Sequence, residues 1–331
     1  MDQLYSILES VWGIERKDIV PIAGGYQNHV SEVLINGDFH ILRISKDSTR
    51  SKAQILSELM WCSSLHQDNL SVVKPLERPN AEIVKSFLSE NELYHAVLFE
   101  KVPGKKLTYG EYLNNEWIYQ QIGKLTAQIH AHSLFFSQQH EVHRPYWYEN
   151  AYIKEFKNIV PLEDVELHNA FDELISECHQ LEININNFGL IHGDINVGNF
   201  HVYDNRVILF DFDECQWSWY VEDIAISLFY TIYVYGEDAK DERIQQGKTF
   251  LRHYLNEYKK IIPISEKELA LIPLFLRLRE FIVYVGVCKK WDLSNTNQWQ
   301  TDYLKDTRLR LALGRSLMDI EDIFDCNIDQ L

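Results

Sequence analysis

Cysteine is scarce in this sequence, and the spacing of the few cysteines excludes the structures that cysteines most often build. No two of them form a C-x-x-C pair and their number is odd, so neither a disulfide framework nor a zinc site is predicted. Scattered thiols are typical of a reducing compartment, and no signal-peptide pattern is visible at the N-terminus. The sequence therefore predicts a cytoplasmic protein. The five cysteines are Cys62, Cys178, Cys215, Cys288 and Cys326.

Basic charge is also in short supply. Lysine and arginine together number 32, against 49 aspartates and glutamates, which gives a formal net charge of -17. Nucleic acids and anionic membranes require a basic surface on their partners, so this balance disfavours both. It suits a cationic substrate, although acidic residues also serve simply to keep a protein surface soluble.

Long hydrophobic runs are missing as well. The nearest approach to a membrane span is the segment 269–288, which carries Arg277, Arg279 and Glu280 at its middle. A central arginine costs about 2.5–3.5 kcal/mol on membrane insertion. The segment is therefore predicted to be a mostly buried helix, and no membrane partner is expected.

The patterns that are present divide the chain into two parts. After a segment with helical periodicity at 4–12, strand-like runs broken by turn residues dominate the first hundred residues, around a helix at 51–66. Beyond Pro103–Gly104, apolar residues recur at helical spacing, and only one compact β segment is predicted, near 189–213. We therefore predict an α+β protein with a β-rich domain at 1–102 and a mainly helical domain at 103–331. Helices are predicted in the second part at 116–136, 163–183, 221–234, 240–260, 266–288 and 302–322.

The strongest pattern lies at residues 188–214, FGLIHGDINVGNFHVYDNRVILFDFDE. Asn199 follows Asp194 by five residues, and Asp211 comes another twelve residues on. Apolar runs flank Asp204–Asn205 between them, which predicts a short hairpin with a two-residue turn. We expect this hairpin to fold back and to bring Asp211 beside the loop that carries the other two side chains.

Two carboxylates and an amide form an oxygen-rich group suited to Mg²⁺. Phosphoryl transfer needs such a group, because metal ions neutralise the charge on the phosphoryl oxygens while a carboxylate accepts the proton of the attacking hydroxyl. Aspartate and asparagine are also common turn formers. The combination of H-G-D-x-x-x-x-N, a hairpin and a strand ending in D-F-D favours the catalytic interpretation.

This stretch resembles the catalytic and metal-binding segments of the aminoglycoside phosphotransferase and choline kinase superfamily, relatives of the protein kinases. The resemblance implies a protein-kinase-like, two-lobed fold with ATP and Mg²⁺ as cofactors. It implies that Asp194 is the catalytic base and that Asn199 and Asp211 hold magnesium. His192 is expected to support the loop, and Asp213 is a further candidate metal ligand.

The first hundred residues carry matches to the same superfamily. Residues 22–33, IAGGYQNHVSEV, resemble its hairpin over the phosphates. This match implies nucleotide contacts for Gly24, Gly25 and Asn28. A pair of glycines marks a turn as readily as a nucleotide loop, so the match depends on the segments that follow.

The next strand-like run, FHILRIS, offers Arg43 where protein kinases carry a lysine for the α- and β-phosphates. Glu58, on the following predicted helix, is placed to pair with it. Arginine is a planar fork, so its phosphate contacts need not copy those of lysine. Residues 97–107 resemble the segment that joins the lobes, where backbone groups from Glu100 to Val102 would meet adenine.

Residues 214–229 resemble an aromatic stretch that leads into a helix in the same superfamily. There Asp223 is expected to brace the catalytic loop through backbone hydrogen bonds. Trp217, Trp219 and Tyr220 could form a wall of the acceptor site or part of the core. The combination of D-F-D-E-C with W-x-W-Y is most similar to the homoserine-kinase-like and stress-response-kinase-like branch.

These patterns predict an ATP-dependent kinase that phosphorylates a hydroxyl group of a small molecule, such as an amino alcohol or an amino sugar. Glu214, Glu222 and Glu280 would suit a cationic acceptor. One alternative is a Ser/Thr protein kinase of the stress-response type, although no activation-loop segment is visible between Asp211 and Asp223. The other is a nucleotide-binding scaffold without catalysis, which the intact catalytic motif disfavours.

Overall fold

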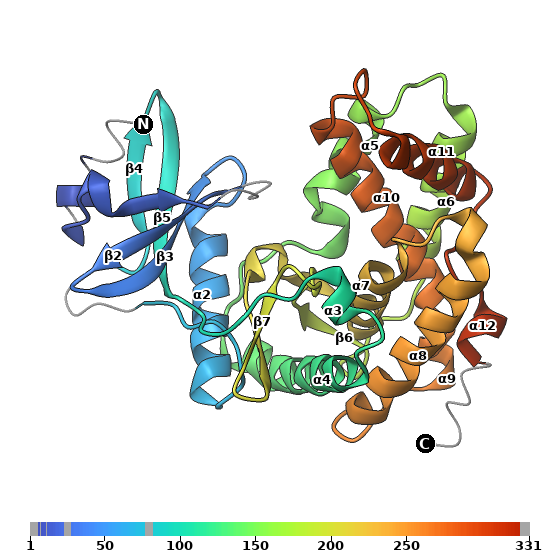
Figure 1. Ribbon diagram of the computed structural model, residues 1–331, viewed down its shortest axis with the longest axis horizontal. Helices are drawn as coiled ribbons and strands as arrows, with labels where there is room; N and C mark the ends of the chain where they lie inside the picture. Colours follow the sequence, from blue (N-terminus) through green and yellow to red (C-terminus); the bar gives the residue numbers. More distant parts are fainter. Residues whose placement is uncertain (1–5, 7, 11, 23–27, 77–81, 325–331) are drawn as a thin grey trace. The chain divides into compact units, whose positions relative to one another are not determined.

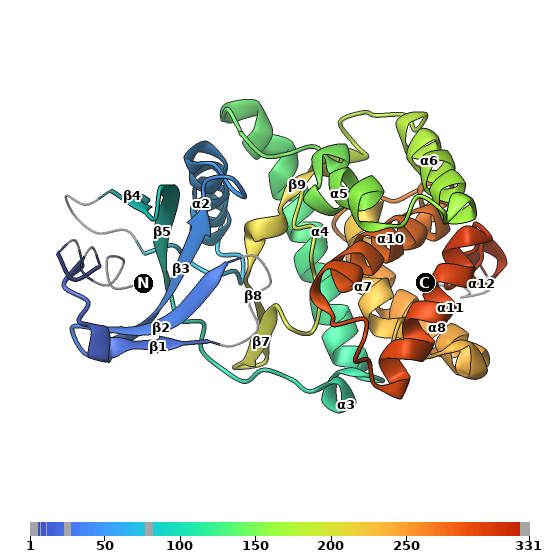
Figure 2. The same cartoon turned by 90° about the horizontal axis from the view of Figure 1, so that it is seen from above.

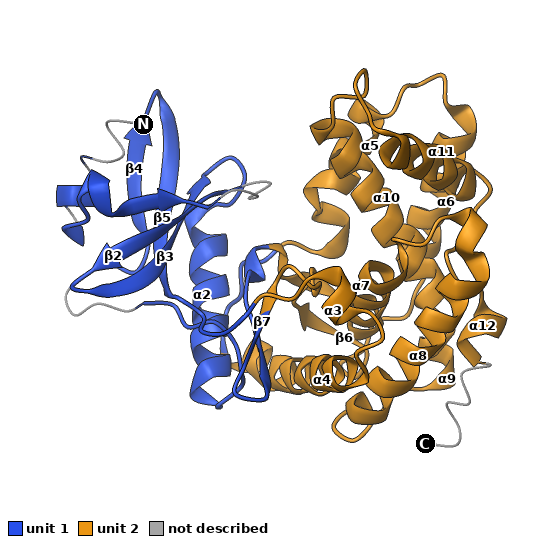
Figure 3. Cartoon of the chain, in the orientation of Figure 1, with its two compact units in different colours: residues 1–105, 140–144, 201–213 blue, residues 106–139, 145–200, 214–331 orange. Residues whose placement is uncertain are grey.

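The computed structural model describes residues 6, 8–10, 12–22, 28–76 and 82–324. The chain forms two compact units, coloured separately in Figure 3. Each unit combines three stretches that are not contiguous in the sequence. The first consists of residues 1–105, 140–144 and 201–213, and the second of residues 106–139, 145–200 and 214–331.

A five-stranded antiparallel sheet with the strand order β1-β2-β3-β5-β4 forms most of the first unit (Figure 1). Asn36 and Gly37 join β2 to β3 in a tight hairpin turn, with positive φ angles of 53° and 93°. The bounds in this unit are η1 Arg16–Asp18, β1 Ile19–Pro21, β2 His29–Ile35, β3 Asp38–Lys46, α2 Lys52–Gln67, β4 Lys85–Ser89 and β5 Glu92–Glu100.

Helix α2 lies alongside this sheet in both views of the chain (Figures 1 and 2). It begins after Ser51, whose hydroxyl accepts a hydrogen bond from the Gln54 N–H in a capping box. Its apolar residues Ile55, Leu59 and Cys62 are all buried. The face of α2 that carries these three residues is therefore the face that packs in the core.

A second hairpin, of which all but Phe200 belongs to the first unit, has β7 at Phe200–Tyr203 and β8 at Arg206–Leu209. Its two turn residues, Asp204 and Asn205, have φ angles of 48° and 53°, so the predicted two-residue turn is confirmed. The hairpin is tied to earlier segments of the unit by backbone hydrogen bonds. Val73 donates to the Leu209 carbonyl at 2.8 Å.

The second unit is mainly helical and contains one antiparallel pair, β6 with β9. Helix α4 packs on α8 and β6, while α10 packs on α5, α6, α7 and α11. The remaining elements of the chain have the bounds α3 Tyr109–Tyr112, α4 Glu116–Gln139, η2 Trp147–Glu149, α5 Ala151–Ile159, α6 Val165–His179, β6 Phe188–Ile191, η3 Phe212–Glu214, β9 Gln216–Trp219, α7 Tyr220–Ile232, η4 Glu237–Ala239, α8 Lys240–Tyr258, α9 Glu266–Leu269, α10 Ile272–Lys290, α11 Gln298–Ala312 and α12 Ile320–Phe324.

Two predictions about the C-terminal helices have different outcomes. The apolar segment near 269–288 forms the largely buried helix α10, as expected, and none of the described helices is long and apolar enough to cross a membrane. The single helix predicted at 302–322 is wrong, because α11 ends at Ala312. Gly314 adopts a φ of 63° there, and its N–H bonds back to the Leu311 carbonyl at 2.9 Å, which terminates the helix.

Candidate active site

The loop that carries Asp194 lies in the second unit between β6 and Asn199. Strand β6 is fixed by its antiparallel pairing with β9, in which Ile191 lies opposite Gln216. Beyond the strand, Ile195 and Val197 are buried, while Asp194 and Asn199 remain partly accessible. Alternate residues of this short loop therefore anchor it in the core and present polar side chains.

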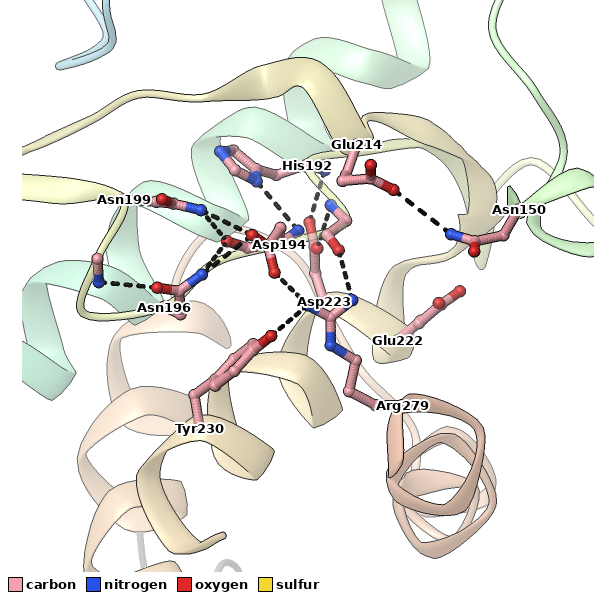
Figure 4. A network of polar contacts seen from close by, with 12 residues as sticks. Asn150, His192, Asp194, Asn196, Asn199, Glu214, Glu222, Asp223, Tyr230 and Arg279 are labelled. Carbon is pink, nitrogen blue, oxygen red and sulfur yellow. Dashed lines mark hydrogen bonds and ion pairs between the residues drawn. The ribbon is translucent and has the colours of Figure 1, made fainter. Parts of the chain in front are cut away.

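Asp223, in the first turn of α7, holds the start of this loop (Figure 4). Its carboxylate accepts hydrogen bonds from the backbone N–H groups of His192 and Gly193, both at 2.8 Å. The ring of His130 contacts the same carboxylate at 3.1 Å. The predicted brace is thus confirmed, and Asp223 is buried completely.

The Asp194 carboxylate is held from two sides (Figure 4). Its Oδ2 accepts hydrogen bonds from the side-chain amides of Asn199 at 2.8 Å and Asn196 at 3.1 Å. Its Oδ1 forms an ion pair with Arg279. The backbone N–H of Asp194 also donates to Nδ1 of His192 at 3.2 Å, so His192 supports the loop from within.

Arg279 reaches this loop from the buried face of α10. Its guanidinium donates to the Tyr230 hydroxyl at 2.6 Å and to the Gly193 carbonyl at 3.3 Å, besides its ion pair with Asp194. It also lies over the Tyr230 ring, 5.0 Å from the centroid. One buried cation therefore contacts both the backbone and the side chain of the loop.

Gly193 is required by the shape of the same loop. Its φ of 79° lies in the left-handed region that side chains rarely adopt. A Cβ atom at this position would lie 2.4 Å from the backbone carbonyl oxygen of Glu214. The close approach of these two backbone segments therefore excludes any larger residue.

The charges around the loop set the protonation of its carboxylate. Burial raises the pKa of Asp194 to about 6, and the guanidinium of Arg279 opposes this rise. Asp194 therefore remains mostly ionised at neutral pH, yet binds a proton more tightly than an exposed aspartate.

The three glutamates predicted to attract a cation have different surroundings. Glu222 is buried and accepts hydrogen bonds from Ser218 and Gln216. Glu280 is buried and paired with Arg310. Glu214 is half-buried, 3.5 Å from the Asn150 amide, and its charge acts on Asp194. Only Glu214 is therefore placed to face a ligand among these three side chains.

In the first unit, the predicted pairing of Arg43 with Glu58 is confirmed. The guanidinium donates to both carboxylate oxygens of Glu58 at 2.7 Å, a bidentate geometry that a lysine cannot form. Both side chains are buried, and Arg43 lies 5.2 Å from the Phe99 ring centroid. The role of the pair in phosphate binding stays a prediction.

Asp213 lies among basic side chains of the same unit. Its carboxylate is 3.5 Å from Nε of Arg50 and 3.7 Å from Nη1 of Arg43. Arg50 and Arg144 also donate hydrogen bonds to its backbone carbonyl. Burial raises the pKa of Asp213, but the three arginines outweigh it and lower the pKa to about 2. These contacts favour a structural role, and metal binding by Asp213 stays a prediction.

The other predicted residues of the first unit are placed as follows. Asp211 is exposed and has a positive φ of 64°. Glu100 ends β5 and pairs with Lys74 at 2.8 Å. The Val102 carbonyl contacts the ring of His201 at 3.2 Å.

The glycine-containing hairpin is described only in part. Gly24 and Gly25 lie outside the described residues. Asn28 is described, and its side chain hydrogen-bonds to Asp213. Among the described residues, no cluster of three or more His, Cys, Asp or Glu side chains could hold a metal ion.

Comparison with known proteins identifies the family. Residues 18–262 match a model of the phosphotransferase enzyme family. The chain belongs to the phosphotransferase enzyme family. This phosphotransferase is 27% identical over 300 residues to amicoumacin kinase of Bacillus subtilis (strain 168), covering 90% of this chain and 88% of the relative.

Two solved structures are similar along nearly the whole length. Amicoumacin kinase hAmiN in complex with AMP-PNP, Ca²⁺ and Ami is 26% identical, with a TM-score of 0.86 and coverage of 97% of this chain and 96% of the other. A microcompartment-associated aminopropanol kinase is 18% identical, with a TM-score of 0.74 and coverage of 96% and 100%. The predicted α+β fold of protein-kinase type is confirmed, and the phosphotransferase is an enzyme rather than a scaffold.

The sequence did not reveal every residue that contacts the loop of this phosphotransferase. Arg279 and Tyr230 were missed, although a charged residue in the middle of an apolar helix is a signal that it has a buried partner. Of the two roles considered for Trp219 and Tyr220, a wall of the acceptor site or part of the core, their burial favours the core. Trp217 is half-buried.

Proposed function

We propose that this phosphotransferase moves the γ-phosphate of ATP to a hydroxyl group of a small molecule, and that Asp194 accepts the hydroxyl proton. The observation that carries this proposal is the fixed Asp194 carboxylate, with Asn199 and Asn196 on one oxygen and Arg279 on the other. A carboxylate that is ionised, oriented and partly accessible is the group that general-base catalysis requires.

The raised pKa supports the same role. A carboxylate with its pKa near 6 is still mostly ionised at neutral pH, and it is a stronger base than an ordinary aspartate. Buried surroundings therefore favour proton acceptance by Asp194 without keeping it protonated at rest.

Mg²⁺ is the ion that we propose, with Asn199 and Asp211 as ligands on the family resemblance. Asn199 fits this role, because its amide nitrogen donates to two oxygens of Asp194 and its Oδ1 has no hydrogen-bond partner among the described residues. Asp211 fits because it is exposed and has a strained backbone of the kind that functional sites retain. The ion would neutralise charge on the phosphoryl oxygens.

For the nucleotide, the proposal assigns the phosphates to Arg43 and adenine to the backbone of Glu100–Val102. The bidentate pair with Glu58 would hold Arg43 in one orientation, which limits the entropy lost when phosphate binds. Gly24, Gly25 and Asn28 remain candidates for the cover over the phosphates. The amicoumacin kinase hAmiN, a relative of this chain, is in complex with AMP-PNP and Ca²⁺.

For the acceptor, we propose a small molecule that bears an amino group near its reactive hydroxyl. The relatives compared above are named for amicoumacin and for aminopropanol, and neither name denotes a protein acceptor. Glu214 is the acidic side chain whose charge acts on Asp194, so it is the candidate partner of a substrate ammonium group.

Consumption of ATP by the purified protein tests this proposal. The acceptor panel contains amicoumacin, aminopropanol, choline, homoserine and aminoglycosides, with casein as the protein acceptor. We expect consumption to depend on an amino-bearing small molecule, to stop with a chelator and to return with Mg²⁺. Phosphorylation of casein alone, or transfer that a chelator does not affect, would contradict the proposal.

A further inference from the structure

The contacts of Arg279 form a bridge between helix α10 and the loop of the proposed base. Its ion pair is with Oδ1 of Asp194, and its hydrogen bond to Gly193 holds the preceding carbonyl at 3.3 Å. Tyr230 supports the guanidinium through its hydroxyl at 2.6 Å and its ring at 5.0 Å. Tyr230 thus orients the guanidinium, which in turn holds Gly193 and Asp194.

The burial of Arg279 makes this bridge hard to replace. Only 7% of the residue is exposed, and an unpaired cation at such a depth would be strongly unfavourable. Asp194 forms the ion pair that compensates this buried charge, and each side chain restricts the positions that the other can adopt.

Two opposed sets of donors prevent rotation of the Asp194 carboxylate. Arg279 acts on Oδ1, while the amides of Asn196 and Asn199 act on Oδ2. Turning the carboxylate about its Cβ–Cγ bond would break contacts at both oxygens at once. A side chain held in this way can offer a reacting hydroxyl only a narrow range of geometries.

We propose that Arg279 is a positioning residue for the phosphoryl transfer, acting through Asp194 by fixing the direction in which its carboxylate faces. This inference rests on the proposed function, because it assumes that Asp194 is the base. A misplacement of about 1 Å at a reacting group can cost about 100-fold in rate, so loss of this contact affects turnover more than binding.

The alternative to a positioning role is a buried ion pair that serves stability alone. The chain contains such a pair beside it for comparison, because Arg310 is paired with Glu280, the residue next to Arg279 in α10. Arg310 is also buried, and its side chain contacts Glu280, Glu237 and Thr307. Arg310→Met is therefore the matched control for removal of a buried guanidinium.

A double-mutant cycle tests the inference. The rate measured is transfer of labelled γ-phosphate from ATP to aminopropanol or amicoumacin, or to water where neither is accepted. Arg279→Met should lower kcat by about 100-fold and leave KM for ATP within about two-fold. In an Asp194→Asn background the same substitution should change kcat by less than about three-fold, because the group it positions is gone.

The controls separate the possible failures. Folding is checked by circular dichroism, and Tyr230→Phe, which removes only one hydroxyl, should lower kcat in the wild-type background alone. An equal fall in kcat for Arg279→Met and Arg310→Met would overturn the positioning role. So would a double variant in which the separate effects of Arg279→Met and Asp194→Asn on kcat multiply. A normal kcat in Asp194→Asn itself would instead refute the base assignment.

Discussion

Arg43 and Glu58 meet through two parallel hydrogen bonds of 2.7 Å in the interior of the first unit. The arginine comes from β3 and the glutamate from α2, so the pair joins the sheet to its helix. Because both side chains are buried, neither charge can return to water without unfolding, so loss of this contact should lower the stability of the unit.

Replacing this arginine tests how much the bidentate geometry contributes to the free energy of unfolding. Arg43→Lys keeps a charge but loses one of the two hydrogen bonds, so we expect a loss of about 1–3 kcal/mol in the free energy of unfolding. Arg43→Met leaves Glu58 unpaired and should cost about 3–5 kcal/mol. Urea denaturation measures both.

The control for this series is an exposed ion pair of the same unit, Lys46 with Glu92 at 2.5 Å. Lys46→Met should change the free energy of unfolding by less than about 1 kcal/mol. If Arg43→Met and Lys46→Met lower the free energy of unfolding equally, the buried pair does not stabilise the unit more than an exposed pair. KM for ATP should rise for Arg43→Lys and stay constant for Lys46→Met.

Gly193→Ala tests the close contact behind the catalytic loop. Its Cβ would meet the Glu214 carbonyl oxygen at 2.4 Å in a backbone of positive φ, so the loop must move. We expect a loss of about 1–3 kcal/mol in stability and a fall in kcat. Gly37→Ala is the control, since its φ of 93° is equally unfavourable but nothing lies within 4 Å of its Cβ. A similar fall in kcat for both variants would contradict a local effect on the loop.

The buried Glu222 predicts a pH dependence of stability. Burial raises the pKa of Glu222 to about 7, above its ordinary value of 4.5 in the unfolded chain. The folded state therefore binds this proton more tightly, so its contribution to stability is complete below pH 4.5 and is lost as the pH rises through 7. The contribution amounts to about 3 kcal/mol.

Comparison with Glu222→Gln isolates this group from others that titrate in the same range. Urea unfolding is measured for both proteins between pH 4 and about 8. The wild type should lose stability relative to the variant as the pH rises. A difference that stays constant with pH would show that Glu222 does not titrate in this range.

Much of the site could be predicted because its signals are local in the sequence. The loop with Asp194 and Asn199 and the turn at Asp204–Asn205 each occupy a few consecutive residues, and their spacing limits the possible geometries. The pairing of Arg43 with Glu58 followed from the family resemblance, which places the two residues on a strand and on the helix after it.

The remainder depends on packing between distant segments. Arg279 lies 85 residues from Asp194, and helical periodicity cannot show which loop a buried face will meet. Trp219 lies in the core because β6 and α10 cover it, which its aromatic character alone does not show. The end of α11 depended on a single glycine, Gly314, within an otherwise helical pattern.

The assignment of Asp194 as the catalytic base is the central claim, and single-turnover transfer by Asp194→Asn tests it most directly. We predict that transfer of the γ-phosphate falls by about 10²–10⁴-fold. The thermal stabilisation by ATP and Mg²⁺ should be retained, and Asp172→Asn, at an exposed ion pair with Lys157, should behave as the wild type. Turnover of Asp194→Asn within a few-fold of the wild type would contradict the account.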